Sequence, residues 1–175
     1  VFVNDAFGAV HRAHASTAGV AEYIPAVCGF LIEKEVKFIG GAVDEPERPF
    51  VAIMGGAKVG DKIPVIENLI NKVDTLIIGG GMSYTFFKAM GLKIGTSILD
   101  EPSLDLAKEL MVKAADAGVD MILPVDVVCA KEFDNNSDTI VCDIDNIPED
   151  RMGLDMGPKS VEAVSKILAE AKTVV

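Results

Sequence analysis

The pattern of apolar and polar residues divides the chain into two stretches, and the longer one begins near residue 50. From there, short apolar runs without alternation are separated by segments whose apolar positions recur every three to four residues. The expected strands are residues 50–54, 73–78, 119–124, 139–143 and 173–175, and the expected helices are residues 61–72, 82–90, 103–118 and 161–172. Strands that are apolar on both faces and separated by helices predict an α/β fold with a parallel sheet covered on both sides.

The first 49 residues have a different pattern. Residues 1–8 read as a strand entering a loop, and residues 29–43 read as one helix of mixed character. The segment 44–49, DEPERP, has two prolines and predicts a boundary between two parts of the chain. The chain opens without methionine inside one expected strand and stops inside another, so we expect it to be a piece of a longer protein.

Composition narrows the class of protein. Half of the 175 residues are hydrophobic, which is enough for a substantial core, and no apolar stretch reaches the roughly 18 residues that a membrane span needs. The net charge of −11 disfavours nucleic acid as a partner, because a polyanion would be repelled. The three cysteines, Cys28, Cys129 and Cys142, have no metal-site spacing, so we expect buried free thiols in a reducing cytoplasm.

The segment 55–62, GGAKVGDK, combines glycines and two lysines between an expected strand and an expected helix. It departs from the P-loop pattern because Asp61 stands where that pattern has lysine. Glycines permit tight turns beside a ligand, and the start of a helix offers free N–H groups to an anion. With Lys58 and Lys62 the loop is suited to a chain of phosphates, although two solvated surface lysines would give the same pattern.

Two further glycine-rich stretches precede helices. The first is IIGGGMSYTFF (77–87), and the second is MGLDMGP (152–158), which reads as a turn. Close packing of strand against helix explains either one alone. Three such loops at one end of a parallel sheet instead predict a nucleotide cleft. None has the GxGxxG pattern of a dinucleotide-binding domain, which disfavours a dehydrogenase.

Two other positions carry candidate chemistry. Arg12 lies between His11 and His14, and its guanidinium is suited to a carboxylate or a phosphate, although a plain surface arginine is an equal alternative. The histidines lack a nearby third ligand, so no metal site is assigned. Asp126 follows an expected strand in LPVD and is expected either to contact a ligand or to cap a helix.

Several stretches, in this order, resemble the phosphoglycerate kinase family over the whole chain. They are VNDAFGAVHRAHAS, ERPFVAIMGGAKVGDKI, IIGGGMSYTFF, IGTSILDE, LPVDVV and MGLDMGPKS. The resemblance implies a Rossmann-like parallel sheet flanked by helices, as an incomplete C-terminal domain, with a remnant of a second α/β domain. It assigns residues 1–28 to the tail of an N-terminal phosphoglycerate-binding domain, 29–45 to an interdomain helix and linker, and 46–175 to a partial nucleotide-binding domain.

The resemblance also implies a reaction and its site. The reaction is reversible phosphoryl transfer between 1,3-bisphosphoglycerate and ADP, giving 3-phosphoglycerate and ATP in glycolysis, with Mg²⁺ accompanying the nucleotide. Lys58 and Lys62 are expected to act in catalysis and Arg12 to bind phosphoglycerate. The residues expected to bind the nucleotide are Gly56, Ala57, Lys62, Gly80, Gly81, Ile98, Gly153 and Leu154.

The resemblance further implies a cytoplasmic monomer without nucleic-acid or membrane partners. Family segments that complete both substrate sites have no match among these 175 residues, so we expect the chain alone to be inactive. A non-catalytic nucleotide-binding module is the alternative, and it would bind nucleotide with no dependence on Arg12.

Overall fold

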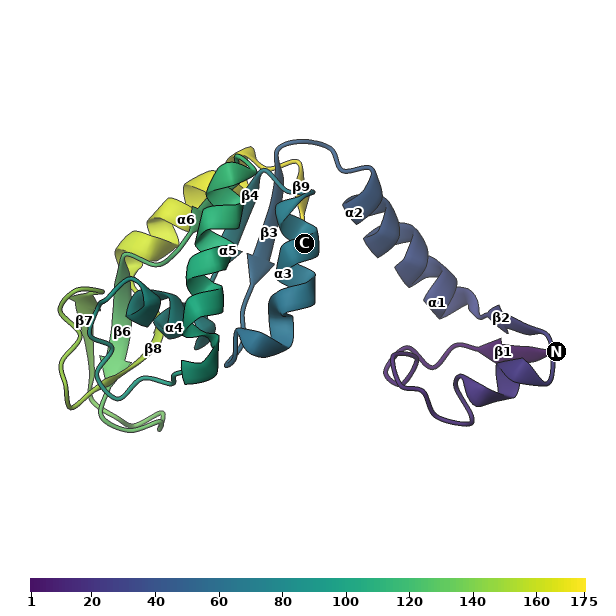
Figure 1. The fold of residues 1–175 in the computed structure, drawn as a ribbon, viewed down its shortest axis with the longest axis horizontal. Helices are drawn as coiled ribbons and strands as arrows, with labels where there is room; N and C mark the ends of the chain where they lie inside the picture. The colour runs from purple at the N-terminus through teal and green to yellow at the C-terminus, as the bar shows by residue number, and fades with distance from the viewer. The chain divides into compact units, whose positions relative to one another are not determined.

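The computed structural model describes all 175 residues and divides them into two compact units, Val1–Pro46 and Glu47–Val175 (Figure 1). The division falls at the proline-containing segment that the sequence marks as a boundary. The roles assigned to residues 1–28, 29–45 and 46–175 remain predictions. No helix in either unit combines the length and the apolar character needed to span a bilayer.

The first unit is a short strand pair followed by a continuous helical segment. Strands β1 (Phe2–Asn4) and β2 (Ala26–Cys28) pair in parallel, with a 3-10 turn, η1 (Gly19–Glu22), between them in the chain. The helical segment comprises α1 (Phe30–Glu35), a π-helical turn, η2 (Val36–Gly40), and α2 (Gly41–Asp44). The Asp5 carboxylate accepts a hydrogen bond from the Ile32 amide at 2.9 Å and so ties the loop after β1 to α1.

The second unit is built on a four-stranded parallel sheet in the order β5-β4-β3-β9, which confirms the predicted fold class. Its strands are β3 (Phe50–Met54), β4 (Thr75–Ile78), β5 (Asp120–Ile122) and β9 (Thr173–Val174). All four residues of β4 are buried, as expected for a central strand covered on both faces.

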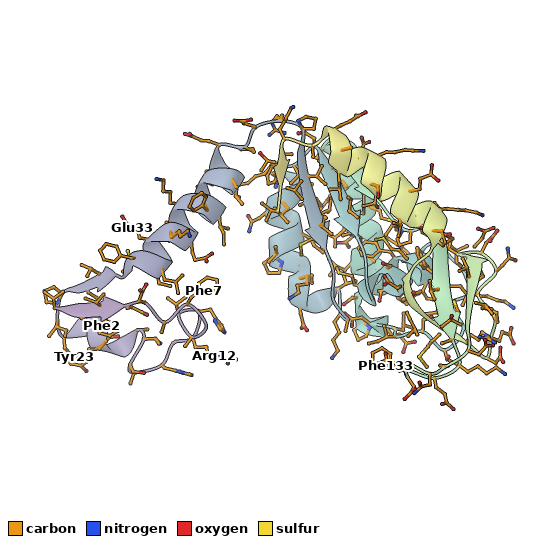
Figure 2. All side chains as sticks on the ribbon, turned by 180° about the vertical axis from the view of Figure 1, so that it is seen from behind. Phe2, Phe7, Arg12, Tyr23, Glu33 and Phe133 are labelled. Carbon is orange, nitrogen blue, oxygen red and sulfur yellow. The ribbon has the colours of Figure 1, made fainter.

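Helices cover both faces of this sheet. They are α3 (Ile63–Ile70), α4 (Met82–Ala89), α5 (Leu104–Asp116) and α6 (Pro158–Glu170), with 3-10 turns η3 (Gly60–Lys62) and η4 (Glu101–Ser103) preceding α3 and α5. Figure 1 shows α3 and α5 in front of the strands, and the reverse view in Figure 2 shows α6 in front. The core between the layers includes Phe50, Ile66, Leu76, Phe86 and Leu110, each fully buried.

A second, antiparallel sheet lies between β5 and α6 in the chain and was not predicted, although its strand at residues 139–143 was expected as a strand. Its order is β7-β6-β8, with β6 (Asp126–Ala130), β7 (Thr139–Asp143) and β8 (Met152–Met156). The prediction that 152–158 forms a glycine-rich turn was therefore wrong, because residues 152–156 pair with β6 as a strand. A cluster containing Tyr84, Phe87 and Val127 forms the core under this sheet.

Two smaller predictions also need correction. Asp126 begins β6 instead of ending a strand, since the preceding strand stops at Ile122. Of the three thiols, only Cys129 is fully buried, whereas Cys28 is exposed and Cys142 is half-buried. The short strand β2 has no covering layer within its unit, and all three of its residues are exposed.

Candidate functional site

The first two glycine-rich loops leave the parallel sheet side by side. Strands β3 and β4 are neighbours in register, with Met54 opposite Ile78, so residues 55–57 and 79–81 follow at the same edge. The Gly79 amide donates to the Met54 carbonyl at 2.8 Å, and the Met82 amide donates to the Gly56 carbonyl at 2.7 Å. The two loops are therefore joined to each other as well as to the sheet.

Glycine is required where these loops touch. Gly80 has a φ of +63°, a conformation that other residues rarely adopt. A methyl group at Gly81 would lie 2.7 Å from Ile98 Cγ2 and 3.3 Å from Ala57 Cα. The absence of side chains lets backbone form the surface at this edge, as a flat ligand lying against it would require.

Strand β8 supplies the facing wall. Gly153 is held by its amide, which donates to Ser97 Oγ at 2.9 Å. Beneath it lies Tyr84, which is 2% exposed and packs edge-on against Phe87 with ring centroids 5.6 Å apart. Burial raises the pKa of Tyr84 well above its ordinary value, so the phenol stays neutral. The wall thus presents the backbone of Gly153 to a ligand and rests on the buried ring of Tyr84.

These elements enclose a cavity of about 390 Å³. Its lining residues are Gly56, Ala57, Gly81, Ile98, Phe133, Met152, Gly153 and Leu154. Six of them are among the eight residues expected to bind nucleotide. The remaining two residues do not line the cavity. Gly80 precedes the lining residue Gly81, and the Lys62 side chain lies close to the lining residue Gly56. The mixture of glycine backbone and apolar side chains is typical of sites for flat, partly apolar ligands.

Sequence reasoning missed two lining residues, Phe133 and Met152. Phe133 belongs to the loop between β6 and β7 and is 88% exposed (Figure 2). Its signal in the sequence was a lone aromatic residue in the otherwise polar stretch KEFDNNSD. Met152 lay in a stretch that was read as a turn, so its side chain was not considered.

The two lysines of the first loop lie next to this cavity without ionic partners. Lys62 is half-buried, and its Cε would be 3.8 Å from a methyl group at Gly56, whereas Lys58 is exposed. The structure's ion pairs involve neither lysine. Lys58 is nevertheless attracted to the Asp100 carboxylate. Two positive charges outside any ion pair, beside a nucleobase-sized cavity, are what a bound phosphate chain would require.

The structure does not bring Arg12 into this unit. Arg12 lies in the first unit, on the loop between β1 and η1, where its guanidinium has no ion pair (Figure 2). His11 and His14 are on the same loop, and nowhere in the structure do three or more His, Cys, Asp or Glu side chains gather in a way that could hold a metal ion.

Asp126 has the helix-capping role that was one of its two predicted alternatives. It is 1% exposed, and its carboxylate accepts hydrogen bonds from the Lys159 amide at 3.0 Å and the Ser160 amide at 2.8 Å in the first turn of α6. Burial alone would raise the pKa of Asp126, but these bonds and one from Ser160 Oγ lower it overall.

A larger cavity, of about 670 Å³, lies between α3 and the end of α5, away from the glycine-rich loops. It is an open groove lined mainly by polar residues, and it contains the ion pair between Glu67 and Lys113. Because no glycine backbone or free cation faces it, we place the functional site at the smaller cavity.

Comparison with known proteins identifies the family. A family model described as phosphoglycerate kinase matches residues 1–175, the whole chain. The chain belongs to the phosphoglycerate kinase family. It is 57% identical over 176 residues to the phosphoglycerate kinase of Clostridium tetani and equally to that of Clostridium perfringens strain 13. The alignments cover 100% of this chain and 44% of each relative, so the chain spans less than half their length.

Solved structures of the family share the fold. The chain resembles phosphoglycerate kinase from Coxiella burnetii with a TM-score of 0.90 and 43% identity over 99% of this chain and 45% of that one. Its likeness to the enzyme from Pyrococcus horikoshii has a TM-score of 0.81 at 25% identity, over 98% of this chain and 44% of that one. The antiparallel sheet that the sequence did not predict is thus part of a chain that matches phosphoglycerate kinases almost throughout.

Proposed function

We propose that the second unit binds ADP or ATP for phosphoryl transfer to and from 3-phosphoglycerate, the reaction implied by the family. The observation that carries the proposal is the single cavity lined by six of the eight residues expected to bind nucleotide, with Lys58 and Lys62 beside it and outside any ion pair. The adenine ring would lie between the glycine backbone and the apolar side chains, and the phosphates would extend toward the lysines.

The proposed chemistry depends on charge and position. Phosphoryl transfer has little covalent work for the protein to do, and negative charge is spread over the transferring group in the transition state. Cations fixed beside that group stabilise it most when they are already in place and not engaged elsewhere. Lys62, half-buried against Gly56, is the more restrained of the two, whereas exposed Lys58 can follow the phosphates.

The residues present suit the nucleotide better than they suit a metal bound to protein alone. Mg²⁺ commonly binds through substrate phosphates, water and one or two carboxylates, so a cluster of three acidic ligands is not required. When bound, Mg²⁺ would neutralise phosphate charge. The chain's own part in the proposal is the glycine cradle, the apolar walls and the two lysines.

The acceptor side rests on Arg12. Its guanidinium is exposed and unpaired, and a planar fork of donors suits a carboxylate or a phosphate. We propose that it contacts phosphoglycerate, that the protein acts as a cytoplasmic monomer, and that these 175 residues alone bind nucleotide without turnover. Arg12→Ala should then leave ADP affinity unchanged.

Isothermal titration of the 175-residue chain with ADP tests the proposal. Lys58→Ala and Lys62→Ala should each weaken ADP binding by roughly five- to tenfold, the effect of losing one charge-assisted contact. The matched control is Lys88→Ala, because Lys88 is also exposed and unpaired but lies at the end of α4. Absence of ADP binding, or equal losses from all three variants, would contradict the proposal.

A non-catalytic nucleotide-binding module is the second candidate, and one observation favours it. The cavity and both lysines belong to a single unit and need no residue from Val1–Pro46. Addition of ATP with and without 3-phosphoglycerate to a longer form of the protein separates the two, because only a kinase would form ADP in a way that depends on 3-phosphoglycerate.

A further inference from the structure

Asp100 contacts the lysine-containing loop without lining the cavity. Its Oδ2 atom accepts a hydrogen bond from the Gly60 amide at 2.9 Å and another from Ser103 Oγ at 2.8 Å. Gly60 lies midway between Lys58 and Lys62 in the chain. One carboxylate oxygen thus joins the loop to the turn that begins α5.

Asp100 is itself held by buried residues. Its backbone amide donates to Thr85 Oγ1 at 3.1 Å, and Thr85 lies fully buried in α4. Ser103 is 6% exposed. Buried residues therefore fix the position of the carboxylate, and the carboxylate in turn fixes the position of Gly60 through its hydrogen bond.

The loop has few other attachments at this point. Val59 is fully buried, and the Lys62 amide donates locally to the Val59 carbonyl at 2.9 Å. Asp100 is the only residue whose side chain hydrogen-bonds to the backbone between Ala57 and Lys62. A methyl group at Gly60 would lie 3.3 Å from Asp100 Oδ2 and 3.1 Å from Ser103 Oγ, so the contact is close.

We propose that Asp100 is a positioning residue, which holds the loop so that Lys58 and Lys62 meet the phosphates of a bound nucleotide; this rests on the proposed function above. Hydrogen bonds from the Gly60 amide and the Ser103 hydroxyl lower the pKa of Asp100, so the group is ionised at neutral pH. Its negative charge repels a phosphate and also attracts Lys58, whose positive charge helps to lower the pKa of Asp100, so the charge by itself opposes phosphate binding. The position and the charge of Asp100 therefore have opposite effects on the affinity for ADP, so that variants that remove one or both can separate the two effects.

The test compares ADP with adenosine, which shares the base and ribose but lacks phosphates. Titration calorimetry on the 175-residue chain would measure both ligands for Asp100→Ala, Asp100→Asn and the control Asp105→Ala. Asp105 is an exposed carboxylate in the first turn of α5 whose one ion pair is with Lys108. Asp100→Ala should weaken ADP binding at least fivefold, an effect comparable to the loss of about one hydrogen bond. The affinity for adenosine should stay within twofold of that of the unaltered chain.

Asp100→Asn should restore ADP affinity to that of the unaltered chain or better. An asparagine carbonyl oxygen can accept the same two hydrogen bonds, and the repelling charge is gone. Ser103→Ala removes the other bond to Oδ2 and should weaken ADP selectively, which keeps the idea testable if Asp100→Ala does not fold. Asp105→Ala should change neither affinity.

Four results would overturn the inference. Tighter ADP binding by Asp100→Ala would mean that its charge outweighs any positioning. Parallel losses for ADP and adenosine would mean that the residue only supports the fold. If the unaltered chain binds adenosine but not ADP, or neither, the proposed function fails and this inference fails with it, whereas normal ADP binding by every variant overturns the inference alone.

Discussion

Replacing Gly153 by alanine tests how the facing wall of the cavity is built. A methyl group there would lie 2.2 Å from the Tyr84 hydroxyl oxygen and 2.4 Å from both Cζ and Cε1 of the same ring. The φ of Gly153 is not positive, so backbone strain is not the issue. The tyrosine ring is buried against Phe87 and cannot swing into solvent. Strand β8 must therefore move away from it.

The expected cost follows from two contributions. Overpacking a tight site costs about 1–3 kcal/mol. A shift of the strand also lengthens the hydrogen bond from the Gly153 amide to Ser97 Oγ, whose loss is worth about 1 kcal/mol. The free energy of unfolding should fall by about 2–4 kcal/mol, and the affinity for ADP should fall as the cavity changes shape.

Urea unfolding followed by far-UV circular dichroism measures the loss. Gly55→Ala is the matched control, because its methyl group would meet only the Gly79 carbonyl oxygen at 3.9 Å, an ordinary contact. Adding Tyr84→Phe to Gly153→Ala should recover only part of the loss, since the two ring carbons remain. Equal stability of the Gly153→Ala and Gly55→Ala proteins, or full recovery by Tyr84→Phe, would refute the steric reasoning.

Three further predictions concern other residues. Folding lowers the pKa of Asp126, so the stability that its carboxylate supplies is complete above about pH 4 and is lost as the pH falls through the pKa of the folded state. Between pH 5 and pH 2, the free energy of unfolding measured in urea should therefore fall less for Asp126→Asn than for the unaltered chain. With a thiol reagent, exposed Cys28 should react at once, whereas Cys129, whose pKa burial raises to about 12, should react only after denaturation; equal rates would contradict this. Phe133→Ala should weaken adenosine and ADP alike without lowering stability, because the ring is exposed and would contact only the base; calorimetry and urea unfolding check both parts.

The parallel sheet and its helices could be predicted because their signals are local. The apolar runs at β3 and β4 and the helical spacing in α5 each lie within one short segment. The two glycine-rich loops after β3 and β4 could also be placed together, since carboxyl ends of neighbouring parallel strands share an edge.

The antiparallel sheet escaped prediction because its pairings are not local. Strand β8 contains only five residues with a glycine second, and it becomes a strand because β6, 22 or more residues earlier, offers it hydrogen bonds. The fit of Gly153 over Tyr84 joins residues far apart in the chain. For the same reason Phe133 could not be assigned to the cavity, and Asp100 could not be recognised as a support for Gly60.

The central claim is that adenine nucleotide binds in the cavity bounded by the glycine-rich loops and β8. The most direct test is a titration of isotope-labelled protein with ADP, followed by amide nuclear magnetic resonance. The account predicts shifts at Gly56, Gly81 and Gly153, with no change at Glu67 or Asn71 in the groove between α3 and α5. Shifts confined to that groove, or none anywhere at millimolar ADP, would contradict it.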